Sequence, residues 1–132
     1  MEKKSFVPKI ESIHEIQEFV KSCIPTDNDD PRKLLNIDLI IEEIVINIIN
    51  YGLKDYPKGV IVIGVDILNQ DMIIEISDNG IEFNPFEIED PDVNAPLDDR
   101  EPGGLGFFFV KELTRNVSYS RKDGKNILHL IL

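Results

Sequence analysis

The residues best suited to chemistry in this sequence are polar side chains inside an apolar segment. A run rich in Ile, Leu and Val between residues 32 and 51 is interrupted by Asn36, Glu43, Asn47 and Asn50. An α-helix turns by about 100° per residue, so these four side chains should share a stripe roughly 40° to 60° wide. A narrow polar stripe on a buried helix is costly unless it lines a cavity or is fully hydrogen-bonded.

Two interpretations of this stripe remain open on the residues alone. In one, the Asn side chains bond to neighbouring loops and Glu43 pairs with a lysine, as in many structural polar networks. In the other, the stripe faces a metal and phosphate groups. An Asn side chain offers a neutral oxygen to Mg²⁺, which prefers few protein ligands together with phosphates. Glu43 lies one turn before Asn47 and could take a proton from an attacking hydroxyl.

A second group is the sequence Asp78-Asn79-Gly80, which follows the apolar run of residues 72–77. An Asp-Asn-Gly sequence between apolar runs is a good hairpin turn. Alternatively, Asp78 stands at the end of a strand and accepts a hydrogen bond from an exocyclic amine. Gly80 would then let the backbone pass close to a flat ring.

A third group is Gly103-Gly104-Leu105-Gly106, which precedes a predicted helix. Glycines before a helix let backbone N–H groups approach a phosphate, and the helix dipole favours negative charge there. The sequence matches neither the Walker A pattern nor the dinucleotide-binding pattern G-x-G-x-x-G. A flexible hinge explains these glycines about equally well.

The elements that must position these residues follow from hydrophobic spacing. We predict helices over residues 11–23, 32–51 (with Gly52 as the stop) and 105–115, and strands over 5–8, 60–67, 72–77, 117–121 and 125–132. The last two strands should form a hairpin across Asp123-Gly124. Strands joined by tight turns are antiparallel. The prediction is therefore an α+β fold, a two-layer α/β sandwich with a mostly antiparallel sheet and helices on one face.

Length and charge narrow the possible functions. The chain has 132 residues, which predicts one domain over 1–132, with a long loop at about 87–103. The formal net charge is −11, from 14 Lys and Arg against 25 Asp and Glu. This acidity disfavours a nucleic-acid or anionic membrane surface as partner. We see no signal peptide or membrane span, so the expected location is the cytoplasm.

The order and spacing of the three groups resemble the ATP-binding domain shared by gyrase, heat-shock chaperone ATPases, histidine kinases and mismatch-repair ATPases, which has the Bergerat-type fold. Glu43-x-x-x-Asn47 resembles the N-box of that superfamily, Asp78-x-Gly80 its G1 box and Gly104-x-Gly106 its G2 box. Within it, the runs EEIVINIINYG, SDNGIEFNP, GGLGFFFVKEL and DGKNILHL resemble bacterial anti-sigma-factor serine kinases over about residues 5–132.

The resemblance implies ATP or ADP and Mg²⁺ as cofactors. Glu43 would activate the attacking group, Asn47 would bind Mg²⁺, Asp78 would recognise the adenine amine, and Gly80 would lie beneath the ring. Residues 87–103 would be the ATP lid. Further nucleotide contacts are expected from Asn47, Asn50, Phe83, Arg100, Gly103, Gly104, Leu105, Gly106 and Phe107.

The resemblance also implies partners. Members of this family phosphorylate a serine on a small STAS-domain anti-anti-sigma protein, bind a sigma factor and are commonly homodimers. Three positions depart from the family pattern. Glu82 replaces the second glycine of D-x-G-x-G, Tyr51 stands where these kinases often carry His, and the nearest arginine before the G2 glycines is Arg100. These departures favour an alternative, a non-catalytic ATP- or ADP-binding module that sequesters a protein partner.

Overall fold

The computed structural model describes residues 1–25, 30–87 and 104–132. Almost all of the predicted lid, including Arg100 and Gly103, lies outside these residues. The described elements are β1 (Glu2–Phe6), α1 (Ser12–Ser22), α2 (Pro31–Asn47), η2 (Ile48–Gly52), β2 (Ile61–Leu68), β3 (Asp71–Asp78), η3 (Pro85–Glu87), α3 (Gly104–Leu113), β4 (Asn116–Lys122) and β5 (Lys125–Ile131).

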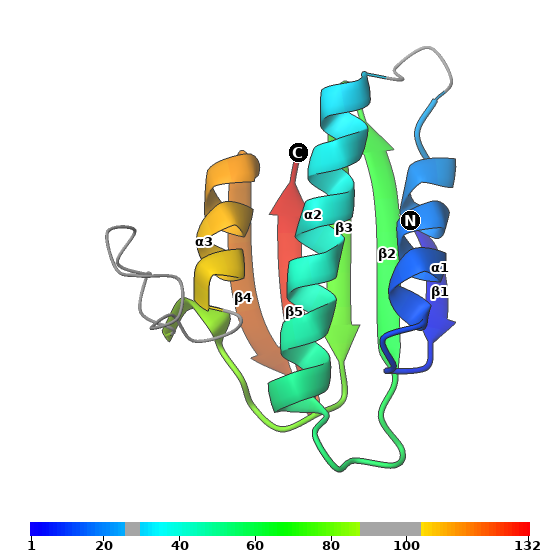
Figure 1. Ribbon diagram of the computed structural model, residues 1–132. Helices are drawn as coiled ribbons and strands as arrows, with labels where there is room; N and C mark the ends of the chain where they lie inside the picture. The colour runs from blue at the N-terminus through cyan, green and yellow to red at the C-terminus, as the bar shows by residue number, and fades with distance from the viewer. Residues whose placement is uncertain (26–29, 88–103) are drawn as a thin grey trace.

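The five described strands form one sheet in the order β1-β2-β3-β5-β4, and every neighbouring pair is antiparallel. Figure 1 shows α1, α2 and α3 side by side on one face of this sheet, with α2 in the middle. The predicted two-layer α+β fold is confirmed. The first strand begins at Glu2 and ends at Phe6, so the predicted bounds of 5–8 were wrong, although its place at the edge was right.

The core lies between α2 and the sheet. Strands β2 and β3 turn every second side chain toward the helices, and these side chains are fully buried aliphatic groups such as Ile63 and Ile74. They pack against one face of α2, which contributes Ile37, Ile41 and Ile44. Burying each such side chain stabilises the fold by about 1.5–3 kcal/mol. None of the described helices is long and apolar enough to cross a membrane.

The carboxyl end of α2 differs from the prediction. The α-helix ends at Asn47 and continues as one π-helical turn, η2, in which Leu53 N–H donates to the Ile48 carbonyl at 2.8 Å. A π-turn bonds residues five apart and so rotates side chains less per residue than an α-helix does. Asn50 is exposed as a result, and the prediction that it shares a buried stripe with Asn47 is wrong.

The final hairpin forms as predicted. Asp123 and Gly124 both have positive φ, 54° and 74°, as a two-residue type I′ turn requires. This turn returns β5 along β4, and β5 also pairs with β3. The register places Asn126 directly opposite Asp78. The strand end that carries the predicted amine acceptor therefore lies beside the start of the last strand.

Candidate functional site

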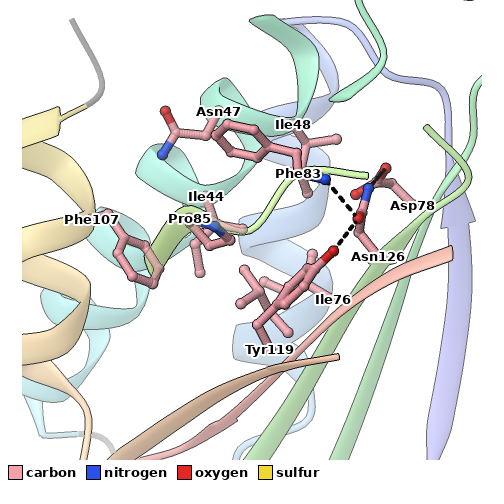
Figure 2. A pocket seen from close by; sticks show the side chains of 11 residues that line it. Ile44, Asn47, Ile48, Ile76, Asp78, Phe83, Pro85, Phe107, Tyr119 and Asn126 are labelled. Carbon is pink, nitrogen blue, oxygen red and sulfur yellow. Dashed lines mark hydrogen bonds between the residues drawn. The ribbon is translucent and has the colours of Figure 1, made fainter. Parts of the chain in front are cut away.

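A pocket lies where the end of α2 meets the ends of β3 and β5 (Figure 2). It is lined by Ile44, Asn47, Ile48, Ile76, Asp78, Phe83, Pro85, Phe107, Tyr119, Asn126 and Leu128. Four of the predicted site residues meet here, namely Asn47, Asp78, Phe83 and Phe107. The cavity between the side chains is about 20 Å³, which is room for about one water molecule.

Asp78 is the last residue of β3 and is only 4% exposed. Its Oδ1 accepts hydrogen bonds from the Gly80 backbone N–H at 2.9 Å and from Asn126 Nδ2 at 3.1 Å. Burial raises the pKa of Asp78, while these two hydrogen bonds and the charge of Arg121 oppose the rise. No donor among the residues that the structure describes reaches Oδ2. The carboxylate therefore keeps one oxygen available as an acceptor.

Gly80 is positioned by the end of η2. A side-chain carbon at this residue would overlap the carbonyl oxygen of Gly52. The same carbonyl accepts a hydrogen bond from the Ile81 N–H at 2.9 Å. Only a residue without a side chain allows this close approach, so Gly80 fixes the path of the loop after Asp78. The segment is a loop leading to η3, and the hairpin interpretation of Asp78-Asn79-Gly80 is wrong.

Glu43 and Gly106 bring the first and third groups into contact. Glu43 is half-buried, and its carboxylate lies so close to Gly106 that a side-chain carbon there would overlap Oε2. Burial, and then the charge of Glu42, raise the pKa of Glu43. No lysine pairs with Glu43 in the described ranges. The structural-network interpretation required such an ion pair, so this part of it is not supported. Gly104 and Leu105 form the first turn of α3 together with Gly106.

Asn47 is the residue of the predicted stripe that is fully buried. It is 4% exposed, and among the residues that the structure describes neither its Oδ1 nor its Nδ2 has a hydrogen-bond partner. An unpaired buried polar group costs about 1–3 kcal/mol. The structural-network interpretation also required the Asn side chains to be hydrogen-bonded. Among the described residues, Asn47 does not meet this requirement. A free amide oxygen at the pocket wall fits a Mg²⁺ ion that takes its remaining ligands from phosphates and water.

Replacing Asn47 with Leu should stabilise the protein. Leucine has a similar size and removes two unpaired polar atoms, so we expect the free energy of unfolding to rise by about 1–3 kcal/mol. Urea unfolding measures this change. Asn36→Leu is the matched control, because Asn36 lies on the same helix but is only half-buried, and it should change stability little. A loss of stability in Asn47→Leu would show that the amide is satisfied.

Aromatic side chains pack against one another at the pocket wall. Phe83 stacks on Tyr51 with ring centroids 5.2 Å apart and an interplanar angle of 11°. Phe107 is buried and meets Phe86 edge to face at 5.1 Å. In Figure 2, Phe83 lies between Asn47 and Asn126. Phe83 and Phe107, both predicted as nucleotide contacts, line the pocket.

Asn126 was not among the predicted site residues. It is 5% exposed and bonds to Asp78, Ile81, Phe83 and Tyr119. One sequence signal could have revealed it. Residues 126, 128 and 130 alternate along the strand, and the other two are buried leucines. A polar residue in phase with two core leucines must face the interior, where it needs partners.

The chain is similar to a known protein family and to a named protein. A family model described as "Histidine kinase-like ATPase domain" matches residues 6–132. The Serine/threonine-protein kinase BtrW of Bordetella bronchiseptica is 27% identical over 104 residues, which cover 79% of this chain and 73% of BtrW.

Solved structures show the same fold. The histidine kinase domain of the blue-light activated histidine kinase from Erythrobacter litoralis EL346 superposes with a TM-score of 0.54 at 12% identity. The match covers 93% of this chain and 59% of that domain. The whole kinase gives the same score and identity, over 96% of this chain and 42% of its own length. This chain thus spans about half the length of the solved structures it resembles.

Proposed function

This chain belongs to the histidine kinase-like ATPase domain family, and we propose that it is a Mg-ATP-dependent protein-serine kinase and anti-sigma factor. An ATPase domain implies nucleotide binding. The observation that carries the proposal is the buried, unpaired amide of Asn47, which shares one pocket with Asp78. Unpaired polar groups in a protein interior are unusual, and a bound Mg²⁺ ion would give this one a partner.

Each group then has a role at a stated atom. Asp78 Oδ2 accepts a hydrogen bond from the exocyclic amine of adenine. Asn47 Oδ1 would hold Mg²⁺, which neutralises charge on the phosphate oxygens. Glu43 takes the proton of a substrate serine hydroxyl while the serine oxygen bonds to the γ-phosphorus and ADP leaves. The raised pKa of Glu43 favours this proton transfer, because its carboxylate binds a proton more readily than an exposed one.

The proposed partners follow the narrower resemblance. A relative named as a serine/threonine-protein kinase, 27% identical, supports transfer to a protein hydroxyl. We take the acceptor to be a serine of a STAS-domain anti-anti-sigma protein, and the sequestered output to be a sigma factor. The proposed assembly is a cytoplasmic homodimer.

A second candidate is a non-catalytic module that binds ATP or ADP and sequesters a partner. It is favoured by Tyr51, which stands where the family pattern often carries His and whose ring stacks on that of Phe83, a residue of the pocket wall. Glu82, exposed beside them, replaces a glycine of the family pattern. Both candidates require nucleotide binding and differ only in phosphotransfer.

Calorimetric titration with ATP, with and without Mg²⁺, tests the shared part of both candidates. We expect saturable binding of ATP that strengthens when Mg²⁺ is present, and no competition by GTP. Incubation of the protein with radiolabelled ATP and a STAS-domain protein then separates them. Label on a serine supports the kinase, and binding without label supports the module. Absence of ATP binding would refute both.

A further inference from the structure

We propose that Asn126 is a positioning residue for nucleotide recognition, one that holds Asp78 with Oδ2 open to the pocket and holds the loop of residues 81–83 as the pocket wall. The inference rests on the proposed nucleotide site and adds to it a residue that contacts no ligand. Four hydrogen bonds of a single buried amide carry it.

The first effect concerns the orientation of Asp78. Asn126 lies opposite Asp78 in the sheet and donates from Nδ2 to Oδ1 at 3.1 Å. The Gly80 N–H donates to the same oxygen at 2.9 Å. The carboxylate can rotate only by breaking both bonds. The two donors together therefore decide which oxygen faces the ligand.

The second effect concerns the loop. Asn126 Nδ2 also donates to the Ile81 carbonyl at 2.7 Å, and its Oδ1 accepts from the Phe83 N–H at 3.0 Å. A carbonyl and an N–H two residues apart are thus bound by one amide, in the way that a neighbouring strand would bind them. Phe83, which lines the pocket, is held by its backbone and not only by its ring.

The amide has no capacity left for a ligand. The Tyr119 hydroxyl donates to Asn126 Oδ1 at 2.6 Å, as Figure 2 shows. An Asn side chain offers two N–H donors and two oxygen lone pairs, and all four are engaged. The reverse amide orientation would place Nδ2 against the Phe83 N–H, a donor against a donor. Asn126 therefore acts through Asp78 and the loop, and not by direct contact.

Asn126→Asp tests the proposal, because it keeps the shape and removes both donors. The charged groups near Asp78 are Arg121 on β4, which donates to the Gly80 carbonyl at 2.8 Å, and Glu82; the neutral but titratable Tyr119 hydroxyl also lies nearby. Two adjacent carboxylates cannot both ionise easily. At pH 8 we expect ATP affinity to fall about ten- to a hundredfold, the effect of losing a charge-assisted hydrogen bond.

The pH profile separates positioning from a merely structural role. In Asn126→Asp, acidification should restore affinity, because one shared proton rebuilds a hydrogen bond to Asp78 Oδ1. In the wild type, where Asp78 has no second carboxylate beside it, acidification should not raise affinity. The expected signature is an affinity that rises with acidification in the variant alone, in calorimetric titrations with Mg-ATP between pH 8 and pH 6.

Asn79→Asp is the matched control. Asn79 adjoins Asp78 in sequence, but in the ranges that the structure describes its side chain bonds only to the Val60 N–H and the Lys58 carbonyl. The variant adds the same charge nearby and should retain wild-type affinity and pH dependence. Should Asn126→Asp fail to fold, Tyr119→Phe decides instead. It removes one bond to the Asn126 oxygen and should weaken ATP binding about two- to tenfold.

The outcomes are distinct. Wild-type ATP affinity in Asn126→Asp, or in Tyr119→Phe where the first variant is unfolded, overturns the positioning role and leaves the proposed function intact. An affinity loss in Asn126→Asp with the wild-type pH dependence also overturns it, because a structural defect would do the same. Lack of ATP binding by the wild type overturns both proposals.

Discussion

Replacing Glu43 with Gln should slow phosphotransfer by roughly 10²- to 10⁴-fold, the usual contribution of a general base, and leave ATP affinity nearly unchanged. Glutamine has the same shape, so it can keep the contact with Gly106 that places this side chain at the start of α3. It cannot take up a proton from the attacking hydroxyl. The measurement is the initial rate of label transfer from ATP to the acceptor protein.

The neighbouring residue supplies the control. Glu42 is exposed one position earlier on α2, so Glu42→Gln makes the same chemical change away from Gly106. It should transfer phosphate at nearly the wild-type rate. Equal rates for wild type and Glu43→Gln would remove Glu43 from the mechanism.

Stability against pH gives an independent reading of Glu43. Burial raises its pKa above the ordinary value of 4.5. The folded state therefore binds this proton more tightly than the unfolded state. Stability contributed in this way is lost as the pH rises from about 4.5 through the raised pKa. Glu43→Gln should lack this part of the pH dependence and should not unfold more easily at neutral pH.

The parts of the fold that sequence predicts are those with local causes. Alternation of Ile and Val places β2 and β3, and Asp123-Gly124 sets the last turn, because each pattern acts within a few residues. Asp78 could be placed at the end of its strand because that strand ends where the apolar run ends. Asn47 could be placed on the buried face of the helix because α-helical spacing continues up to that residue.

The parts that failed have causes elsewhere in the chain. Asn50 left the predicted stripe because η2 changes the rotation per residue, and no local signal in the sequence marks that turn. Alternation with Leu128 and Leu130 marks Asn126 as facing the interior, but its contact with Asp78 could not be foreseen, because Asp78 is 48 residues away. The contact of Glu43 with Gly106 likewise depends on how α3 packs on α2. Long-range packing fixes such contacts, and spacing within one segment cannot reveal them.

Replacing Asp78 with Asn should weaken ATP binding by roughly a hundredfold or more, because a hydrogen-bond acceptor becomes a donor. The Asn oxygen can keep both bonds that Oδ1 now accepts, from Gly80 and Asn126. The new amide group must then occupy the position of Oδ2. There it would face the exocyclic amine of adenine, a donor against a donor.

The fold should survive this change, which makes the binding result decisive. Asp78 is buried and its pKa is raised chiefly by that burial, so its charge is a cost to the folded state at neutral pH. Asn removes that charge and keeps the bonds. Asp66 lies on β2 and, within the described part of the chain, its side chain bonds only to the Ile67 N–H, so Asp66→Asn should bind ATP normally. If calorimetry found wild-type affinity in a folded Asp78→Asn, the base would have to be recognised elsewhere, and the pocket would lose its assignment as the adenine site.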